Sequence, residues 1–413
     1  MPGPLSNLMV LDLTRVLAGP WCTQTLADLG ADVIKVERPA VGDDTRHWGP
    51  PWIPDGSGRP TRDSAYFSSA NRNKKSIAVD ISTPEGRALI RELASTADIL
   101  VENYKVGNLS RYGLGYEDMR NLNPGLIYCS VTGYGQGGPY ANLPAYDFIV
   151  QGAGGLMSIN GEADNKPGGG PMKVSIAVTD VLSGLNATIG ILAAVHSRHL
   201  TGQGQHIDIA LLDVIVNFGA NQLASYFITG EVPERYGNEH PNLTPYQTFP
   251  TADGHIIIGC GNDDQYRRLC TVLGHPELAS DDRFLTMADR NTNRTALQVV
   301  LQDLLGTKTT ADWVDVLVNA GIPCGPINNY RQVFEHPQVV HRQMRVDMHH
   351  PAGGMIGTVR SPIRFSDTPV EYRMGPPLRG QHTEEILSSV LGKAPRTIDA
   401  LRDAGIVETC TPG

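Results

Sequence analysis

The sequence MVLDLTRVLAGPWCTQTLADLGADVIKV, residues 9–36, decides the fold. Its two ends, Met9–Leu13 and Asp32–Val36, are short apolar runs typical of buried strands. Between them, Cys22–Leu29 has helical spacing and is followed by Gly30, a common signal for the end of a helix. A strand, a helix and a second strand in this order predict a βαβ unit with parallel strands.

The same alternation continues outward from this stretch. Thr83 precedes Pro84 and can cap a helix there, because proline tolerates the first helical position. The further predicted strands are Ser76–Asp80, Ile99–Val101, Leu126–Val131 and His206–Ile209, with a long helix over Val181–Arg198. The sequence therefore predicts an α/β fold whose parallel sheet is covered on both faces.

The later part of the chain has a different texture. Gly152–Lys173 is rich in Gly and predicts a long loop. Asp253-Gly254 predicts a hairpin turn between Thr248–Pro250 and His255–Gly259. Helices are predicted over Gln265–Leu273, Arg294–Leu305 and Thr310–Ala320, and short elements return at Met355–Val359 and Glu384–Leu391. We expect a smaller second domain here.

Composition excludes several classes of protein. The 413 residues carry 34 basic and 43 acidic side chains, a net charge of −9, which argues against a nucleic-acid partner. The apolar stretch Val181–Val195 looks too short and too polar to span a membrane. The first residues show no secretory signal, so we expect a cytoplasmic protein. The six cysteines are scattered, which predicts neither a metal site nor disulfides.

One motif invites a nucleotide-binding interpretation and does not support it. Gly133–Gly138 matches GxGxxG after a predicted strand, but the third glycine of that fingerprint must enter a helix. Here Pro139–Pro144 follows, which is typical of a loop. NAD binding is not predicted, and no P-loop, serine-hydrolase or zinc-protease motif is present.

Two features of the residues carry chemistry. Cations follow the predicted strands of the first third, where ligand crevices open in α/β sheets. They are either a set that binds a phosphorylated ligand or a solvated face of the protein. Asp180 stands before the apolar helical run that starts at Val181. It is either an N-cap or a nucleophile that the helix dipole keeps ionised.

Several ordered segments resemble class III CoA-transferases, the formyl-CoA transferase family, over essentially the whole chain. They are Arg15–Pro20, Leu26–Glu37, Asn73–Ile77, Asp98–Asn103, Thr179-Asp180 with Gly184, Thr201–Gln205 and Gly321–Pro326. The resemblance implies a Rossmann-like large domain, a smaller α+β domain and an interlocked-ring homodimer. The corresponding boundaries are 1–225 for the large domain, 226–330 for the small domain, and 331–413 for a segment that returns to the large domain.

The resemblance also implies a mechanism. Asp180 attacks an acyl-CoA thioester, forms a mixed anhydride and then an aspartyl-CoA thioester, and passes CoA to an acceptor acid. Developing oxyanions need amide donors, and Gly259, Cys260 and Gly261 match the family's glycine-rich loop. Tyr146 and Asp147 match a Tyr-Glu pair near the reacting centre. CoA would be a substrate, with no tightly bound cofactor and no metal. Its binding residues carry over to Leu17, Ala18, Arg38, Arg72, Asn73, Lys74, Lys75, Asn103, Tyr104, Lys105 and Arg111.

Two departures bear on substrate choice, and two alternatives stay open. Pro144 stands where formyl-CoA transferase has Lys, and Leu17 where it has Gln, which disfavours a formyl/oxalyl substrate pair. Spare cations such as Arg46 and Arg72 suggest a dicarboxylate of the succinyl-CoA type. The first alternative is an α-methylacyl-CoA racemase, which resembles this chain but uses His-Asp at Tyr146-Asp147 and Glu where Asn262 stands. The second is a CoA-binding protein without catalysis, which would have no need of Asp180.

Overall fold

The computed structural model describes residues 2–410. The chain divides into two compact units. The large unit comprises Met1–Leu156, Val174–Ala224 and Arg342–Gly413, and the second unit comprises Met157–Lys173 and Ser225–His341. The large unit is therefore assembled from three separate segments of the chain.

A mixed sheet is the centre of the large unit. Within residues 2–410 its seven strands lie in the order β14-β5-β2-β1-β6-β7-β8. Every neighbouring pair is parallel except β14 with β5. The strands are β1 (Met9–Leu13), β2 (Asp32–Glu37), β5 (Lys74–Val79), β6 (Ile99–Glu102), β7 (Ile127–Thr132), β8 (His206–Ala210) and β14 (Val407–Glu408). The predicted α/β class is confirmed, with one antiparallel edge strand added.

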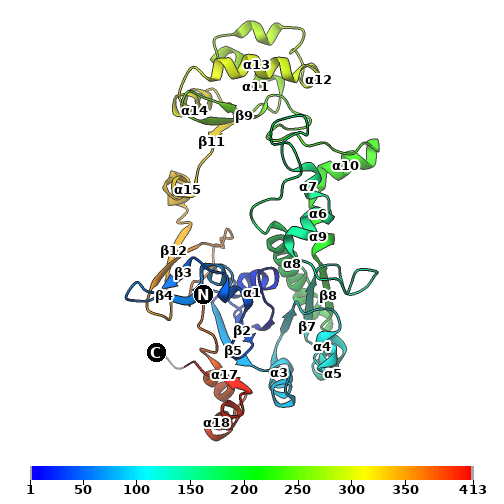
Figure 1. The fold of residues 1–413 in the computed structure, drawn as a ribbon, viewed down its shortest axis with the longest axis vertical. Helices are drawn as coiled ribbons and strands as arrows, with labels where there is room; N and C mark the ends of the chain where they lie inside the picture. Colours follow the sequence, from blue (N-terminus) through cyan, green and yellow to red (C-terminus); the bar gives the residue numbers. More distant parts are fainter. Residues whose placement is uncertain (1, 411–413) are drawn as a thin grey trace. The chain divides into compact units, whose positions relative to one another are not determined.

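Two apolar clusters cover the two faces of this sheet. One joins the strands to α1 (Ala18–Asp28), α8 (Val178–Thr201) and α9 (Leu211–Phe218). The other joins them to α3 (Pro84–Thr96), α5 (Tyr116–Leu122), α17 (Thr383–Ser389) and α18 (Pro395–Asp403). Figure 1 shows the late helix α17 beside the early strand β5, and Thr383 Oγ1 accepts the N–H of Ala78 at 3.1 Å.

The helix α8 is longer than its sequence predicts. It has 24 residues and a mean hydropathy of 1.6 in its most apolar window, so length and composition alone would let it cross a membrane. This corrects the expectation that the stretch is too short. In the structure α8 packs closely against α1 at Gly184. This position has no room for a side chain, since a Cβ there would lie only 2.6 Å from the carbonyl oxygen of Ala18. Its residues Ala187 and Ile191 are fully buried in the core.

Shorter elements complete the large unit. The predicted loop 152–173 is partly helical, because α6 reaches Ala153 and α7 follows. The elements are η1 (Asp44–His47), β3 (Trp52–Pro54), β4 (Pro60–Ser64), α2 (Ala65–Ser68), α4 (Asn108–Arg111), α6 (Asp147–Ala153), β12 (Arg345–His349) and β13 (Met355–Val359). Two of the boundaries between the units fall within α7 (Leu156–Ile159) and α10 (Ala220–Thr229), and the others follow Lys173 and His341.

The second unit has its own apolar core and a small antiparallel sheet in the order β11-β10-β9. The predicted hairpin is confirmed, because β9 and β10 pair across the Asp253-Gly254 turn. The elements are β9 (Tyr246–Pro250), β10 (His255–Gly259), α11 (Asp263–Val272), η2 (Pro276–Ser280), α12 (Met287–Thr292), α13 (Arg294–Leu305), α14 (Thr310–Asn319), β11 (Cys324–Pro326), α15 (Tyr330–Glu335) and α16 (Pro337–His341).

Candidate active site

A cavity of about 450 Å³ opens where the strand order of the large sheet reverses. The neighbours of β1 are β2 and β6, and the chain leaves both β1 and β6 at the same edge of the sheet. Such a switch point is the usual ligand crevice of an open α/β sheet. The cavity is lined by Arg15–Ala18 after β1, Asn103–Val106 after β6, the end of β7, residues 141 and 143–146, and Asp180.

Asp180 brings a free carboxylate to this cavity. The N-cap of α8 is Ala177, so Asp180 belongs to the first helical turn, and the expectation that it is an N-cap is wrong. Within residues 2–410 no hydrogen bond or ion pair engages its carboxylate. Burial, and then the negative charge of Asp147, raises the pKa of Asp180 to about 7. The helix end therefore does not hold this group strongly ionised, which corrects the sequence-based expectation.

Asp147 sits beside Asp180 but has its oxygens occupied. Its Oδ1 accepts the N–H of Thr179 at 2.8 Å, and its Oδ2 accepts from Nε2 of Gln151 at 2.8 Å. Tyr146, the N-cap of α6, is largely exposed and lines the cavity. Of the two carboxylates, Asp147 is committed to backbone and side-chain donors, and Asp180 is available for chemistry.

The first turn of α1 faces the same cavity. Leu17 is its N-cap, no side chain caps the helix, and both Leu17 and Ala18 line the cavity. The first amides of a helix lack partners inside the helix, so they attract negative charge. Gly184, four residues after Asp180, brings the backbone of α8 against Ala18. Asp180 and the start of α1 are thus two parts of one cavity wall.

The loop that leads into α1 contains a strained residue. Val16 has φ = 71°, a left-handed conformation that a β-branched side chain rarely adopts. Such a conformation costs about 1–3 kcal/mol and persists only where surrounding contacts enforce it. Val16 lines the cavity together with Arg15 and Leu17.

The residues carried over for CoA divide into three groups. Leu17, Ala18, Asn103, Tyr104 and Lys105 line the cavity with Asp180. Arg38 and Arg111 are exposed and are not among its lining residues. Lys75 belongs to this second group, because it does not line the cavity either and forms ion pairs with Asp32 and Glu385, at 3.6 and 3.2 Å.

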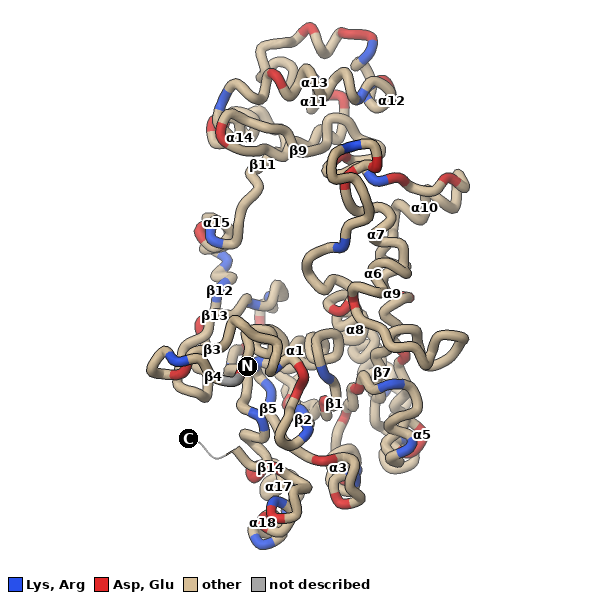
Figure 2. The backbone as a smooth tube through the Cα atoms, viewed as in Figure 1, with Lys and Arg blue, Asp and Glu red and all other residues tan. Residues whose placement is uncertain are grey.

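The third group is buried in the fold and does not reach the cavity. Arg72 pairs with Asp28 at 2.5 Å, and Asn73 donates to the same carboxylate at 2.9 Å. Lys74 on β5 is fully buried and pairs with Asp12 at 3.1 Å. Burial lowers the pKa of Lys74 to about 8. Basic positions on β2 and β5 are visible near the middle of the large unit in Figure 2.

Arg46 is not a spare cation either. Its guanidinium pairs with Glu37 at 2.7 Å and with Asp63 at 2.6 Å, and it stacks on the ring of Phe67. With Arg72 also paired, neither arginine is free to read a substrate carboxylate. The expectation of a dicarboxylate substrate loses that support and must rest on other observations.

The predicted glycine-rich loop belongs to the second unit. Gly259 ends β10, Cys260 is fully buried, and the N–H of Gly261 donates to Gln265 Oε1 at 2.7 Å. Burial raises the pKa of the Cys260 thiol to about 12, so it is not a nucleophile at neutral pH. Asn262 is the N-cap of α11 and accepts the N–H of Gln265 at 2.9 Å.

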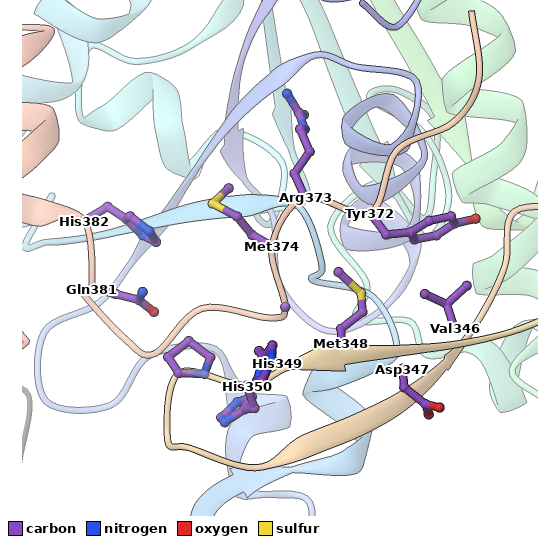
Figure 3. Close-up of a pocket in the computed structure, with 12 residues that line it drawn as sticks. Val346, Asp347, Met348, His349, His350, Tyr372, Arg373, Met374, Gln381 and His382 are labelled. Atoms are coloured by element: carbon purple, nitrogen blue, oxygen red, sulfur yellow. The ribbon is translucent and has the colours of Figure 1, made fainter.

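A second cavity, of about 440 Å³, lies at the β12–β13 hairpin (Figure 3). His349, His350 and His382 line it, while Arg373 points away from them and donates to the carbonyl oxygens of Ala27 and Ala31. Among its described lining residues, Asp347 is the carboxylate, and it pairs with Arg345 at 3.0 Å. This cavity offers no free carboxylate for acyl transfer. Across residues 2–410, no His, Cys, Asp and Glu cluster could hold a metal ion.

Sequence reasoning missed several lining residues. Arg15 and Val16 were part of a motif but were not predicted as site residues, and Asp44 and Leu211 carried no signal. The positions of Arg15 and Val16, directly after a predicted strand at a switch point, could have indicated them.

A partly buried carboxylate without a partner, in a crevice at the carboxyl ends of parallel strands, is typical of an α/β enzyme. A model of the family described as CoA-transferase family III matches residues 5–383, so the chain belongs to that family and is an enzyme of that type.

Named relatives match over nearly their whole length. The chain is 47% identical over 391 residues to the succinate–glutarate CoA-transferase of Agrobacterium fabrum, covering 94% of this chain and 96% of the relative. It is 42% identical over 405 residues to the human succinyl-CoA:glutarate CoA-transferase, covering 98% and 90%.

A solved structure is similar as well. The crystal structure of a CaiB/BaiF family protein from Brucella suis has a TM-score of 0.84 and 46% identity, and the match covers 94% of this chain and 100% of that one. CoA transfer between acyl-CoAs and carboxylic acids is thus the activity of this group of proteins.

Proposed function

We propose that this enzyme moves CoA between succinyl-CoA and a second dicarboxylic acid of the glutarate type, with Asp180 as the covalent nucleophile. The assignment of Asp180 as the nucleophile rests on its free carboxylate, which faces the switch-point cavity. The choice of acids is supported by the two relatives above, both named for succinate or succinyl-CoA with glutarate.

The reaction balances through two anhydrides. An Asp180 oxygen attacks the thioester carbon, and the C–S bond breaks. CoA departs as its thiolate, and a mixed anhydride remains on Asp180. The thiolate then attacks the Asp180 carbonyl carbon, releasing the first acid and forming an aspartyl-CoA thioester. The acceptor carboxylate attacks this thioester and displaces the thiolate, which finally takes the new acyl group and frees Asp180. The thioester's energy is thereby passed on rather than lost to water.

The neighbours of Asp180 fit this sequence of steps. Each carbonyl addition develops an oxyanion, and the unpaired first amides of α1 supply donors for it. Asp147 holds the first turn of α8 by its bond to Thr179, which fixes the direction of Asp180. Lys105, an exposed cation lining the same cavity, is suited to the phosphates of CoA.

The test is transfer between defined acids. Wild-type enzyme is incubated with succinyl-CoA and glutarate, and mass spectrometry follows glutaryl-CoA; acetate and hexanoate serve as monocarboxylate comparisons. We expect glutaryl-CoA to form fastest. Adding hydroxylamine with succinyl-CoA should inactivate the enzyme and leave one hydroxamate on Asp180. Absence of that adduct would refute the covalent role, and faster transfer to monocarboxylates would refute the choice of acids.

The racemase alternative is tested in the same preparation. A 2-methylacyl-CoA in deuterated water should gain no deuterium at its α-carbon, because Tyr146 stands where the racemases have the histidine of their acid/base pair. Deuterium incorporation would contradict CoA transfer as the proposed activity and support epimerisation.

A further inference from the structure

The loop between β1 and α1 is held from two sides by side chains whose polar groups bond to its backbone. On one side, Asn103 Oδ1 accepts the N–H of Arg15 at 2.9 Å, and Asn103 Nδ2 donates to the carbonyl oxygen of Arg15 at 2.7 Å. Both ends of this amide are therefore consumed by one backbone residue. Asn103 lines the cavity, yet its polar atoms are engaged with protein rather than open to a ligand.

On the other side, a buried ion pair holds the same loop. Lys35 Nζ and Asp43 Oδ2 are 2.9 Å apart, and both side chains have no exposed surface. Asp43 Oδ1 accepts the N–H of Val16 at 3.3 Å, while Lys35 Nζ donates to the carbonyl oxygen of Thr14 at 2.9 Å. A buried pair of charges that bonds to two successive parts of a loop leaves that loop little freedom.

The residue between these two holds is the strained one. Val16, at φ = 71°, is pinned by Asp43 directly and by Asn103 through its neighbour Arg15. Strain of this kind clusters at functional sites, where neighbouring contacts maintain it. The next residue, Leu17, is the N-cap of α1, so the backbone at Val16 sets the direction in which the first amides of α1 enter the cavity.

We propose that Asn103 and the Lys35–Asp43 pair are positioning residues, which force Val16 into its left-handed conformation and thereby aim the start of α1 at the reacting carbonyl beside Asp180. The inference rests on the proposed function and assigns Asn103 a role other than CoA binding. A loss of this hold misdirects the oxyanion donors, so the chemical step slows while the affinity for acyl-CoA changes little.

Two variants of Asn103 separate the roles. Asn103→Ala removes both bonds, and we expect kcat to fall about 10- to 100-fold with KM for acyl-CoA within about threefold of the wild type. Asn103→Asp keeps an acceptor for the Arg15 N–H and loses the donor to the Arg15 carbonyl, so its kcat should lie between the two. A residue that binds CoA would instead show its effect in KM.

A matched control exists elsewhere in the large unit. Asn123 clamps backbone in the same manner, donating to the carbonyl oxygen of Ala97 at 3.0 Å and accepting the N–H of Gly125 at 3.1 Å, and it does not line the cavity. Asn123→Ala should lower Tm without changing kcat. If both Asn→Ala variants lower kcat equally, or if neither does, the proposal is wrong.

Val16→Gly tests the strain itself. Both holds act on backbone atoms, which glycine keeps, and glycine adopts the left-handed region without strain. In the Asn103→Ala background, Val16→Gly should therefore restore part of the lost kcat, because the conformation no longer has to be enforced against a β-branched side chain. A double variant no faster than Asn103→Ala would overturn the proposal.

Hydrogen exchange supplies a readout that needs no activity. Amides of residues 15–18 should exchange faster in Asn103→Ala than in the wild type, and should not change in Asn123→Ala. If the wild type failed to transfer CoA, the proposed function would fall, and these exchange rates would still decide whether the hold exists. Unchanged exchange at residues 15–18 would refute it.

Discussion

Asp147 lies against the first turn of α8 beside Asp180, because its Oδ1 accepts the N–H of Thr179 at 2.8 Å. Burial of Asp180 and the charge of Asp147 together raise the pKa of Asp180 to about 7. Asp147 thus orients the helix and raises the pKa of its neighbour, while Asp180 has no hydrogen-bond partner among residues 2–410.

Asp180→Asn should abolish CoA transfer, with kcat lowered at least about 1,000-fold, because an amide cannot attack the thioester. Affinity for CoA, measured by calorimetry, should stay near the wild-type value. Asp213→Asn is the control, since Asp213 also stands in a first helical turn, that of α9, but is exposed and outside the cavity. Substantial turnover by Asp180→Asn would contradict the assignment of Asp180 as the nucleophile.

The rate should depend on pH through the same group. Because the nucleophile must be ionised, kcat/KM should rise with pH and level off above about 7. Asp147→Asn removes a negative neighbour, which favours the ionised form, so the midpoint should move to lower pH. A midpoint that stays in place, or moves up, would contradict the coupling between the two carboxylates.

Stability should depend on pH with a definite sign. The pKa of Asp180 is raised on folding, so the folded state holds its proton more tightly than the unfolded chain does. Stability from this group is present below its ordinary pKa of 3.8 and is lost as pH rises toward about 7. Asp180→Asn should therefore raise Tm at about pH 8 and change it much less near pH 4. Equal changes at both pH values would disprove the raised pKa.

The contact between α1 and α8 should not tolerate a methyl group. Gly184→Ala puts a Cβ at 2.6 Å from the Ala18 carbonyl oxygen and 3.0 Å from Trp21 Cβ, so we expect a loss of about 1–3 kcal/mol and a lower kcat. Gly190→Ala on the same helix meets side-chain atoms of Ile207 and no backbone, with Cγ2 at 3.2 Å, and should be far milder. Urea unfolding and steady-state kinetics on both variants decide the matter.

Apolar periodicity was sufficient to predict the strands β1 and β2 and the class of the fold, because buried parallel strands are continuous apolar runs. The position of Asp180 was readable too, since it precedes a long apolar helix. Which lysine serves a ligand was not readable. Lys74 and Lys105 both adjoin strands, but Lys74 is consumed by Asp12, 62 residues away in sequence. The left-handed Val16 carried no signal either, because only distant contacts enforce it.

The two-residue strand β14 pairs antiparallel with β5 and closes that edge of the large sheet. A ribosome releases Val407 only after the whole second unit has emerged, so the sheet spends most of its synthesis with β5 as an open edge. An unpaired edge is a template for mispairing with other chains. Nascent large units thus face their greatest aggregation hazard before the last strand arrives, and a C-terminal fusion partner that delays its docking would prolong that hazard.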